Sequence, residues 1–171
     1  MMADAFNAFY NKFNAMVVWS GDTDGYYTQV RTNGEYRVVP SAKYFGTMVA
    51  RLHIFDGSSV MLNEDTYLEP LRHYRLVYES PSTILELGGN EIKYVKVFEY
   101  VEGTAIAGIE MPNAIVELST KITTNQGRVF TYSDIVVVNE TGAYEFIVPY
   151  EEGKTKGVVV EPFVVKNVNY I

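Results

Sequence analysis

The stretch LHIFDGSS holds the residue types of a hydrolase triad, namely His53, Asp56, Ser58 and Ser59. In such a triad a histidine activates a serine for attack on a carbonyl carbon. The serine must also stand on a strand–turn–helix element that exposes it, and the sequence predicts no such element here. We therefore interpret the stretch as a helix end that runs into a turn, and an independent hydrolase is the weakest functional hypothesis.

The sequence predicts no metal site. Its two histidines, His53 and His73, lack the His-x-x-x-His spacing of zinc enzymes, and cysteine is absent from the whole sequence. The stretch DTDG, from Asp22 to Gly25, resembles the start of a calcium loop, but no bidentate glutamate follows at the required spacing. We expect an ordinary turn at this point.

Three nitrogen-bearing side chains cluster in the stretch LRHYR, namely Arg72, His73 and Arg75. Glu69 and Glu79 lie close by in the sequence, so we expect surface ion pairs between these groups. Exposed pairs of this kind contribute roughly 0–1 kcal/mol each. We therefore assign the cluster no catalytic role.

Lys12 is the only cation in the aromatic stretch from Ala3 to Gly21. On a helical wheel it falls at the border of the apolar face, and Met16 follows one turn later. Considered from the residues alone, the lysine stem covers apolar surface while its amine stays in water.

A glycosylation acceptor triplet, Asn139-Glu140-Thr141, lies in a predicted turn between two strands. Such triplets are common by chance. The triplet therefore makes Asn139 an acceptor for a glycan only if this segment is exported.

The composition favours a folded chain that does not bind nucleic acid. Hydrophobic residues make up 47% of the sequence, yet no apolar run reaches the 18 residues of a membrane span. The net charge of −7 leaves no basic stripe that would gain from releasing the counterions of a phosphate backbone. We therefore expect a soluble chain, without nucleic acid as a partner.

The hydrophobic periodicity predicts helices first and strands afterwards, which is an α+β class. We expect an amphipathic helix from Ala3 to Gly21, a hairpin of Tyr26–Arg31 and Glu35–Val39 around Asn33-Gly34, a second amphipathic helix from Ser41 to Gly57, and a strand from Tyr74 to Glu79. From Ile92 onward, β-rich runs separated by turns predict a small sandwich or barrel-like half. Residues 1–90 would be a mixed part and residues 91–171 a β-rich part of one core.

Three stretches resemble the C-terminal globular region of archaeal oligosaccharyltransferase, the AglB-type catalytic subunit that transfers a glycan from a lipid carrier to asparagine. They are NKFNAMVVWSG (Asn11–Gly21), YFGTMVARLHIFDGSS (Tyr44–Ser59) together with LRHYRLVYES (Leu71–Ser80), and YVKVFEYVEGTAIAG (Tyr94–Gly108). Their order and spacing also match the family, and the resemblance covers about residues 5 to 110.

The resemblance implies that this chain is a soluble fragment of a membrane enzyme, on the outer face of the archaeal cell membrane. The parent's partners would be an acceptor polypeptide with Asn-x-Ser/Thr and a lipid-linked oligosaccharide, and its divalent metal ion would be bound in its membrane half. The fragment itself would need no cofactor and would be inactive alone. The family's Trp-Trp-Asp-Tyr-Gly signature is absent from this sequence, where Trp19 is followed by Ser20 and Gly21.

The resemblance also assigns an acceptor-recognition role to Lys12 and Met16. One archaeal form of a short family motif runs Asp-x-x-Lys-x-x-x-Met, and the two residues match its second half, whereas Phe9 replaces the aspartate. Another form runs Asp-x-x-Met-x-x-x-Lys, and only Lys12 matches it, with Ala5 at the acidic position. A lysine and a methionine on one helix edge could offer a threonine both a polar partner and an apolar one.

A noncatalytic extracellular binding module is the alternative. In that hypothesis the β-rich half packs as a sandwich or open barrel against two helices. Transmembrane segments and the Trp-Trp-Asp-Tyr-Gly signature upstream of Ala3 in the full gene would favour the enzyme instead.

Overall fold

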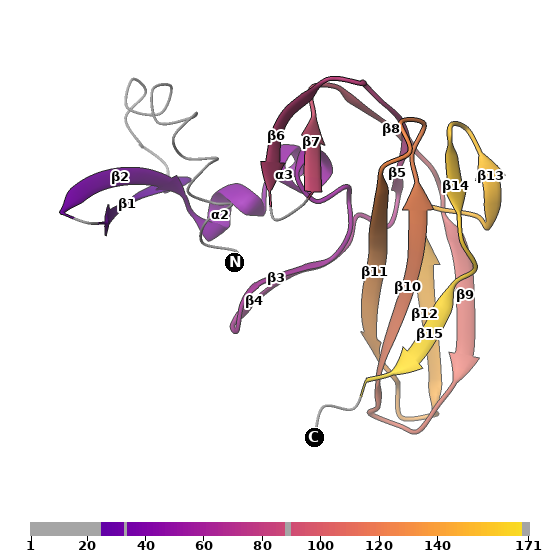
Figure 1. The fold of residues 1–171 in the computed structure, drawn as a ribbon. Coiled ribbons are helices and arrows are strands. Elements are labelled where there is room, and N and C mark those ends of the chain that lie inside the picture. Colours follow the sequence, from indigo (N-terminus) through magenta and orange to yellow (C-terminus); the bar gives the residue numbers. More distant parts are fainter. Residues whose placement is uncertain (1–24, 33, 88–89, 169–171) are drawn as a thin grey trace.

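The computed structural model describes residues 25–32, 34–87 and 90–168. The helix predicted from Ala3 to Gly21 lies outside these residues, and so do Lys12 and Met16. In Figure 1 the long strands of the second half stand together as one β-rich body, with the shorter elements of the first half beside them.

The first two strands form the predicted hairpin. β1 (Tyr27–Thr32) pairs antiparallel with β2 (Glu35–Pro40), and the register places Thr32 opposite Glu35. Two residues therefore connect the strands, and the second of them, Gly34, has a φ of 87°. Because glycine adopts this left-handed conformation at no steric cost, the Asn-Gly pattern predicted the turn correctly.

The single helix predicted from Ser41 to Gly57 is wrong. Two short helices form instead, α2 (Ala42–Phe45) and α3 (Met48–His53). Thr47 separates them because its backbone is extended, with ψ at 150°, and its side-chain oxygen caps α3 by accepting a hydrogen bond from the Ala50 N–H. The described chain is therefore mainly β, with two short helices rather than the expected amphipathic helices.

Three antiparallel strand pairs follow the helices. They are β3 (Val60–Asn63) with β4 (Thr66–Leu68), β5 (Tyr74–Glu79) with β8 (Lys96–Tyr100), and β6 (Thr83–Leu87) with β7 (Asn90–Lys93). The predicted strand from Tyr74 to Glu79 is confirmed as β5 with the same bounds.

The remaining strands form the β-rich half. β10 (Ile115–Thr123) is its centre and pairs with β11 (Val129–Val137) on one side, and with β14 (Val158–Val160) and β15 (Val164–Asn167) on the other. β13 (Gly153–Thr155) extends this sheet by pairing with β14. A second layer consists of β9 (Thr104–Ile109) paired with β12 (Ala143–Val148).

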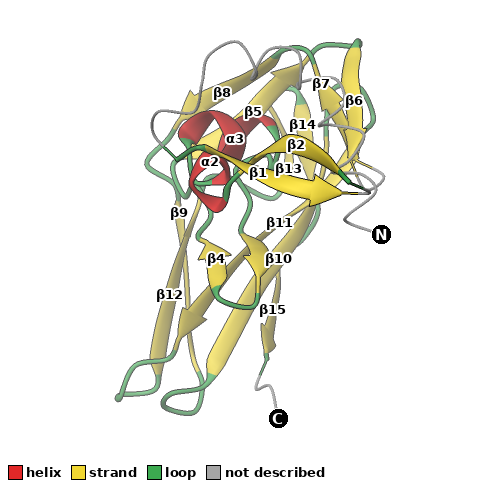
Figure 2. Ribbon diagram, turned by 90° about the vertical axis from the view of Figure 1, so that its left-hand side faces the viewer, coloured by secondary structure: helices red, strands yellow, loops and turns green. Residues whose placement is uncertain are grey.

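The two layers enclose one apolar core, as a sandwich does. Every second residue of β10 is buried, which is the period of a strand with one face on a core. The cluster includes Leu76 from β5, which ties the first half to the sandwich; its other large members are Leu118, Ile122, Phe130, Tyr132, Phe146 and Tyr150. Figure 2 shows the helices, β1–β2 and β5–β8 at one end of the long strands and the β9–β10 and β11–β12 turns at the other.

Candidate functional site

A cluster of buried charges joins the first half of the described chain to the sandwich. Its centre is Arg128, which directly precedes β11 and whose side chain is 9% exposed. The guanidinium donates to both oxygens of Asp56, at 2.7 and 2.8 Å, and to both oxygens of Glu79, at 2.7 to 3.2 Å. Asp56 comes from the turn after α3, and Glu79 ends β5. One arginine thus holds two elements against the start of β11.

The same two carboxylates have further donors. Lys96 of β8 donates from Nζ to Asp56 Oδ1 at 2.6 Å and to the carbonyl oxygen of His53 at 2.9 Å. Thr124, which follows β10, donates its hydroxyl to Glu79 Oε1 at 2.6 Å. We call Asp56, Glu79, Lys96 and Arg128 the charge cluster. Its two positive and two negative groups balance.

Burial and the neighbouring charges together lower the pKa of Lys96 but raise the pKa of Arg128. Burial lowers the pKa of Lys96, and the nearby Arg128 lowers it further, although Asp56 opposes both effects. Burial also disfavours the charged form of Arg128, but the hydrogen bonds and charges of Asp56 and Glu79 outweigh it and raise its pKa above the usual value. Each carboxylate already has several donors, so the cluster can position elements but offers no free acid or base.

An ion pair between the half-buried Arg72 and a buried carboxylate corrects the expectation for the LRHYR stretch. Arg72 does contact Glu69, at 3.7 Å, but its main partner is the fully buried Asp134 of β11, with hydrogen bonds of 2.8 and 3.2 Å. Those hydrogen bonds raise the pKa of Arg72. Arg75 pairs with Glu99 of β8 instead of Glu79, which Arg128 occupies.

The helix-end interpretation of LHIFDGSS is confirmed. His53 ends α3, and its Nε2 lies 2.5 Å from the carbonyl oxygen of Lys93 rather than beside a serine. Ser58 Oγ accepts from the Ser133 N–H, and Ser59 Oγ shares a hydrogen bond with Ser133 Oγ. Within the described ranges, no group of three or more metal-binding side chains comes together either.

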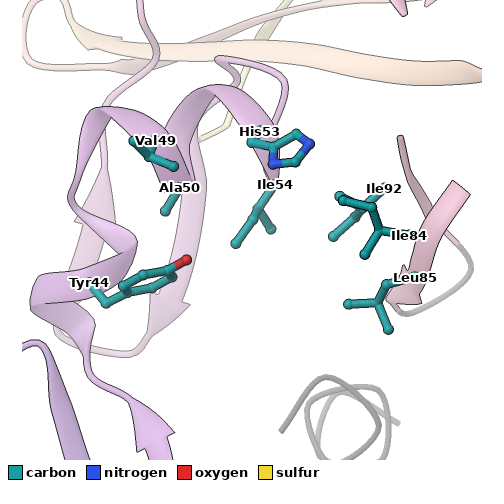
Figure 3. Close-up of a pocket in the computed structure, with 8 residues that line it drawn as sticks. All are labelled: Tyr44, Val49, Ala50, His53, Ile54, Ile84, Leu85 and Ile92. Atoms are coloured by element: carbon teal, nitrogen blue, oxygen red, sulfur yellow. The ribbon is translucent and has the colours of Figure 1, made fainter. Parts of the chain in front are cut away.

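Two hollows flank these contacts. An apolar cavity of about 40 Å³ lies between α3 and the β6–β7 pair, where Figure 3 shows Ala50 and Ile54 facing Ile84, Leu85 and Ile92. Such a volume holds a few waters and no sugar ring. A larger open cleft of about 340 Å³ lies between the segment from Ile54 to Val60 and strands β10 and β11, and Lys121 is the cation at its wall.

Asn139 is exposed in the turn between β11 and β12, as the sequence suggested. Lys12 and Met16 lie outside the described residues. Sequence reasoning missed the charge cluster, and its members carried no motif because they come from four separate segments of the chain. The only signal in the sequence for such a cluster was the position of charged residues such as Glu79 at the ends of predicted strands.

Comparisons with known proteins identify relatives. Residues 103–169 match the family model described as "Archaeal glycosylation protein B long peripheral domain". A curated relative, dolichyl-phosphooligosaccharide-protein glycotransferase 3 of Archaeoglobus fulgidus, is 26% identical in an alignment 192 positions long. The alignment covers 78% of this chain and 21% of the relative. The chain therefore spans about a fifth of the length of that protein.

Solved structures share the fold. The Archaeoglobus fulgidus oligosaccharyltransferase AglB in complex with an inhibitory peptide and a dolichol-phosphate superposes with a TM-score of 0.65 at 22% identity, over 96% of this chain and 27% of the other. An Archaeoglobus fulgidus oligosaccharyltransferase tethered to an acceptor peptide containing the NVT sequon gives a TM-score of 0.62 at 22% identity, over 96% of this chain and 28% of the other. The predicted resemblance is therefore confirmed: this chain is similar to archaeal AglB oligosaccharyltransferase, and its residues 103–169 match the long peripheral domain of that family.

Proposed function

We propose that this chain is the globular part of an archaeal membrane oligosaccharyltransferase, which transfers a lipid-linked glycan to asparagine in Asn-x-Ser/Thr. The observation that carries the proposal is the shared fold over 96% of the chain, together with the family match of residues 103–169. The solved relatives bind an inhibitory peptide, a dolichol-phosphate and an NVT acceptor peptide. These ligands support an acceptor polypeptide and a lipid-linked oligosaccharide as partners of the parent enzyme.

The part of the chain described by the structure would act as a rigid support on the outer face of the membrane. The ion pair of Asp56 with Arg128 and the hydrogen bonds of Ser58 and Ser59 with Ser133 hold the segment from Ile54 to Ser59 against the sandwich. None of the described helices is long and apolar enough to cross a membrane. Contact with the acceptor would fall to Lys12 and Met16.

The parent's metal ion would be held by residues other than those described. One solved relative contains Zn and sulfate. In this chain, however, the buried carboxylates of Asp56 and Glu79 are neutralised by Lys96 and Arg128, and Asp134 is paired with Arg72. A divalent cation would have to displace these partners, so the described donor set does not fit a metal.

Lys12→Ala in the full-length parent tests the acceptor role. If the lysine contacts the acceptor threonine, transfer to an Asn-x-Thr peptide falls roughly ten- to a hundredfold, which corresponds to a lost polar contact of about 1–3 kcal/mol. The thermal melt stays unchanged. Lys166→Ala, an exposed lysine on β15, is the matched control and retains transfer.

Met16→Ala completes the test. We expect a similar loss of transfer, with some loss of stability because a large apolar side chain is truncated. If Lys12→Ala transferred glycan at the wild-type rate, the acceptor role would be wrong, and Lys12 would only cover apolar surface with its stem. The noncatalytic binding module would be favoured if the full-length parent, supplied with lipid-linked oligosaccharide, peptide and metal, transferred no glycan.

A further inference from the structure

The β11–β12 turn presents the one acceptor triplet of the sequence at the surface. Asn139, Glu140 and Thr141 are all exposed, and no other asparagine of the sequence is followed by x-Ser or x-Thr. In Figure 1 this turn lies at the lower end of the sandwich, away from the helices and from β5–β8. A bulky group on Asn139 would therefore meet solvent.

The local hydrogen bonds orient the asparagine side chain. Its Oδ1 accepts from the Thr141 N–H at 2.9 Å, from the Thr141 hydroxyl at 2.7 Å and from the Ala143 N–H at 2.9 Å. Its Nδ2 donates to no acceptor among the described residues. The oxygen is thus used inside the turn, whereas the nitrogen that a glycan would occupy is left at the surface.

We propose that Asn139 is itself a site of N-linked glycosylation. The donor is a glycan joined through C1 to a lipid phosphate. The Asn139 Nδ2–C1 bond forms while the C1–O bond to the phosphate breaks. The lipid phosphate leaves with the electron pair of that bond, and the proton lost from Nδ2 passes to water. The modification requires that this segment is exported, which rests on the proposed location, but it does not require that the chain itself belongs to a transferase.

The glycan is added before the turn closes. In the folded chain the turn is held by hydrogen bonds from the Glu110 N–H to the Gly142 carbonyl, at 2.8 Å, and from the Asn113 N–H to the Val138 carbonyl, at 3.0 Å. The Thr141 hydroxyl is also committed to Asn139. An enzyme that reads the asparagine and the hydroxyl together must break these contacts, whereas an extended chain offers both groups freely.

To test this, the full chain is expressed in an archaeal host that glycosylates proteins and that exports the chain. A second copy of the segment 137–143 is appended as an unstructured tail, and the host is chosen because it modifies that tail. Glycopeptide mass spectrometry is expected to find the same glycan on Asn139. The modification at this position disappears in Asn139→Gln and Thr141→Ala and persists in Thr141→Ser. A modified tail beside an unmodified Asn139 overturns the proposal.

A second arm tests the order of events. Solubilised membranes of the same host, with their own lipid-linked glycan, are given either the folded chain or a synthetic peptide of residues 136–144. We expect the peptide to be modified at least about tenfold faster, since the folded chain must first break the hydrogen bonds that hold the turn. Equal rates would show that addition does not require an open turn.

Discussion

Two buried tyrosines with different hydroxyl environments make a matched pair at the residue scale. Tyr132 and Tyr150 are both fully buried, and their rings meet edge to face with centroids 5.4 Å apart. The Tyr150 hydroxyl accepts a hydrogen bond from the buried Leu76 N–H at 3.0 Å. The Tyr132 hydroxyl has no partner among the described residues.

We expect Tyr150→Phe to destabilise the chain and Tyr132→Phe to leave it nearly unchanged or more stable. The first substitution leaves the Leu76 N–H buried without an acceptor, which costs about 1–3 kcal/mol, whereas the second removes a polar atom that gains nothing from burial. Denaturant unfolding at neutral pH measures both. Equal losses in the two variants would reveal a partner for the Tyr132 hydroxyl, such as an ordered water.

The same pair predicts how stability changes at alkaline pH. Burial raises the pKa of both tyrosines above their usual value of 10.0, so each stays protonated in the fold while the unfolded chain ionises. The unfolded state then binds fewer protons, and the free energy of unfolding falls above pH 10 by about 1.4 kcal/mol per pH unit for each tyrosine. In each Phe variant, the free energy of unfolding should therefore fall less steeply with pH, because one of the two tyrosine contributions to the slope is gone. Lys96, whose pKa is lowered, titrates in the opposite sense but equally in all variants, so an unaltered slope would contradict the assignment.

At the scale of elements, two glycines in positive-φ turns differ in their surroundings. Gly157, before β14, has a φ of 87°, and a Cβ there would lie 2.4 Å from the carbonyl oxygen of Val77 in β5. Gly127, before β11, has a φ of 77°, and nothing lies within 4 Å of such a Cβ. The first turn is thus packed against a neighbouring strand and the second is open.

We expect Gly157→Ala to cost clearly more stability than Gly127→Ala. Both variants incur about 1–2 kcal/mol for a left-handed alanine, but only Gly157→Ala also displaces the backbone of β5. Thermal melts of the two variants check this difference. Equal shifts in the melting temperature would mean that the β13–β14 hairpin moves away from β5 without loss.

At the scale of the whole molecule, Arg128 links distant parts of the chain. Arg128→Ala leaves Asp56 and Glu79 buried with fewer donors, and breaking a buried ion pair in this way costs about 3–5 kcal/mol. Residues 25–100 should then be cleaved by protease before the sandwich, which keeps its own apolar core. Limited proteolysis and unfolding curves measure both effects.

Two controls accompany that measurement. Lys156→Ala removes an exposed partner of Glu99 and should leave the unfolding curve close to that of the parent chain, because solvent screens such a pair. Arg128→Lys keeps the charge but loses the bidentate geometry and should fall between the two. A loss in Arg128→Ala no larger than in Lys156→Ala would mean that the cluster does not hold the halves together.

The division into residues 1–90 and 91–171 stays a prediction.

The sequence by itself determined the local features of this protein. The Asn-Gly turn placed the first hairpin, the alternation of apolar residues predicted the strands after Ile92, and the segment from Tyr74 to Glu79 was placed to the residue. These signals are local because turn conformation and strand period depend on near neighbours in the chain. Three quoted stretches also carried the resemblance to archaeal oligosaccharyltransferase, and the comparisons confirmed it.

Only the tertiary structure decided which charges pair and where the second helix breaks. Arg128 meets Asp56 across 72 positions of the sequence and Glu79 across 49, a pairing fixed by how strands register and layers pack rather than by spacing along the chain. The apolar periodicity after Ser41 resembled one helix, yet Thr47 caps a new one because its extended backbone lets its side chain reach the Ala50 N–H. The periodicity records which side chains are buried, whereas their partners depend on contacts between segments that are far apart in sequence.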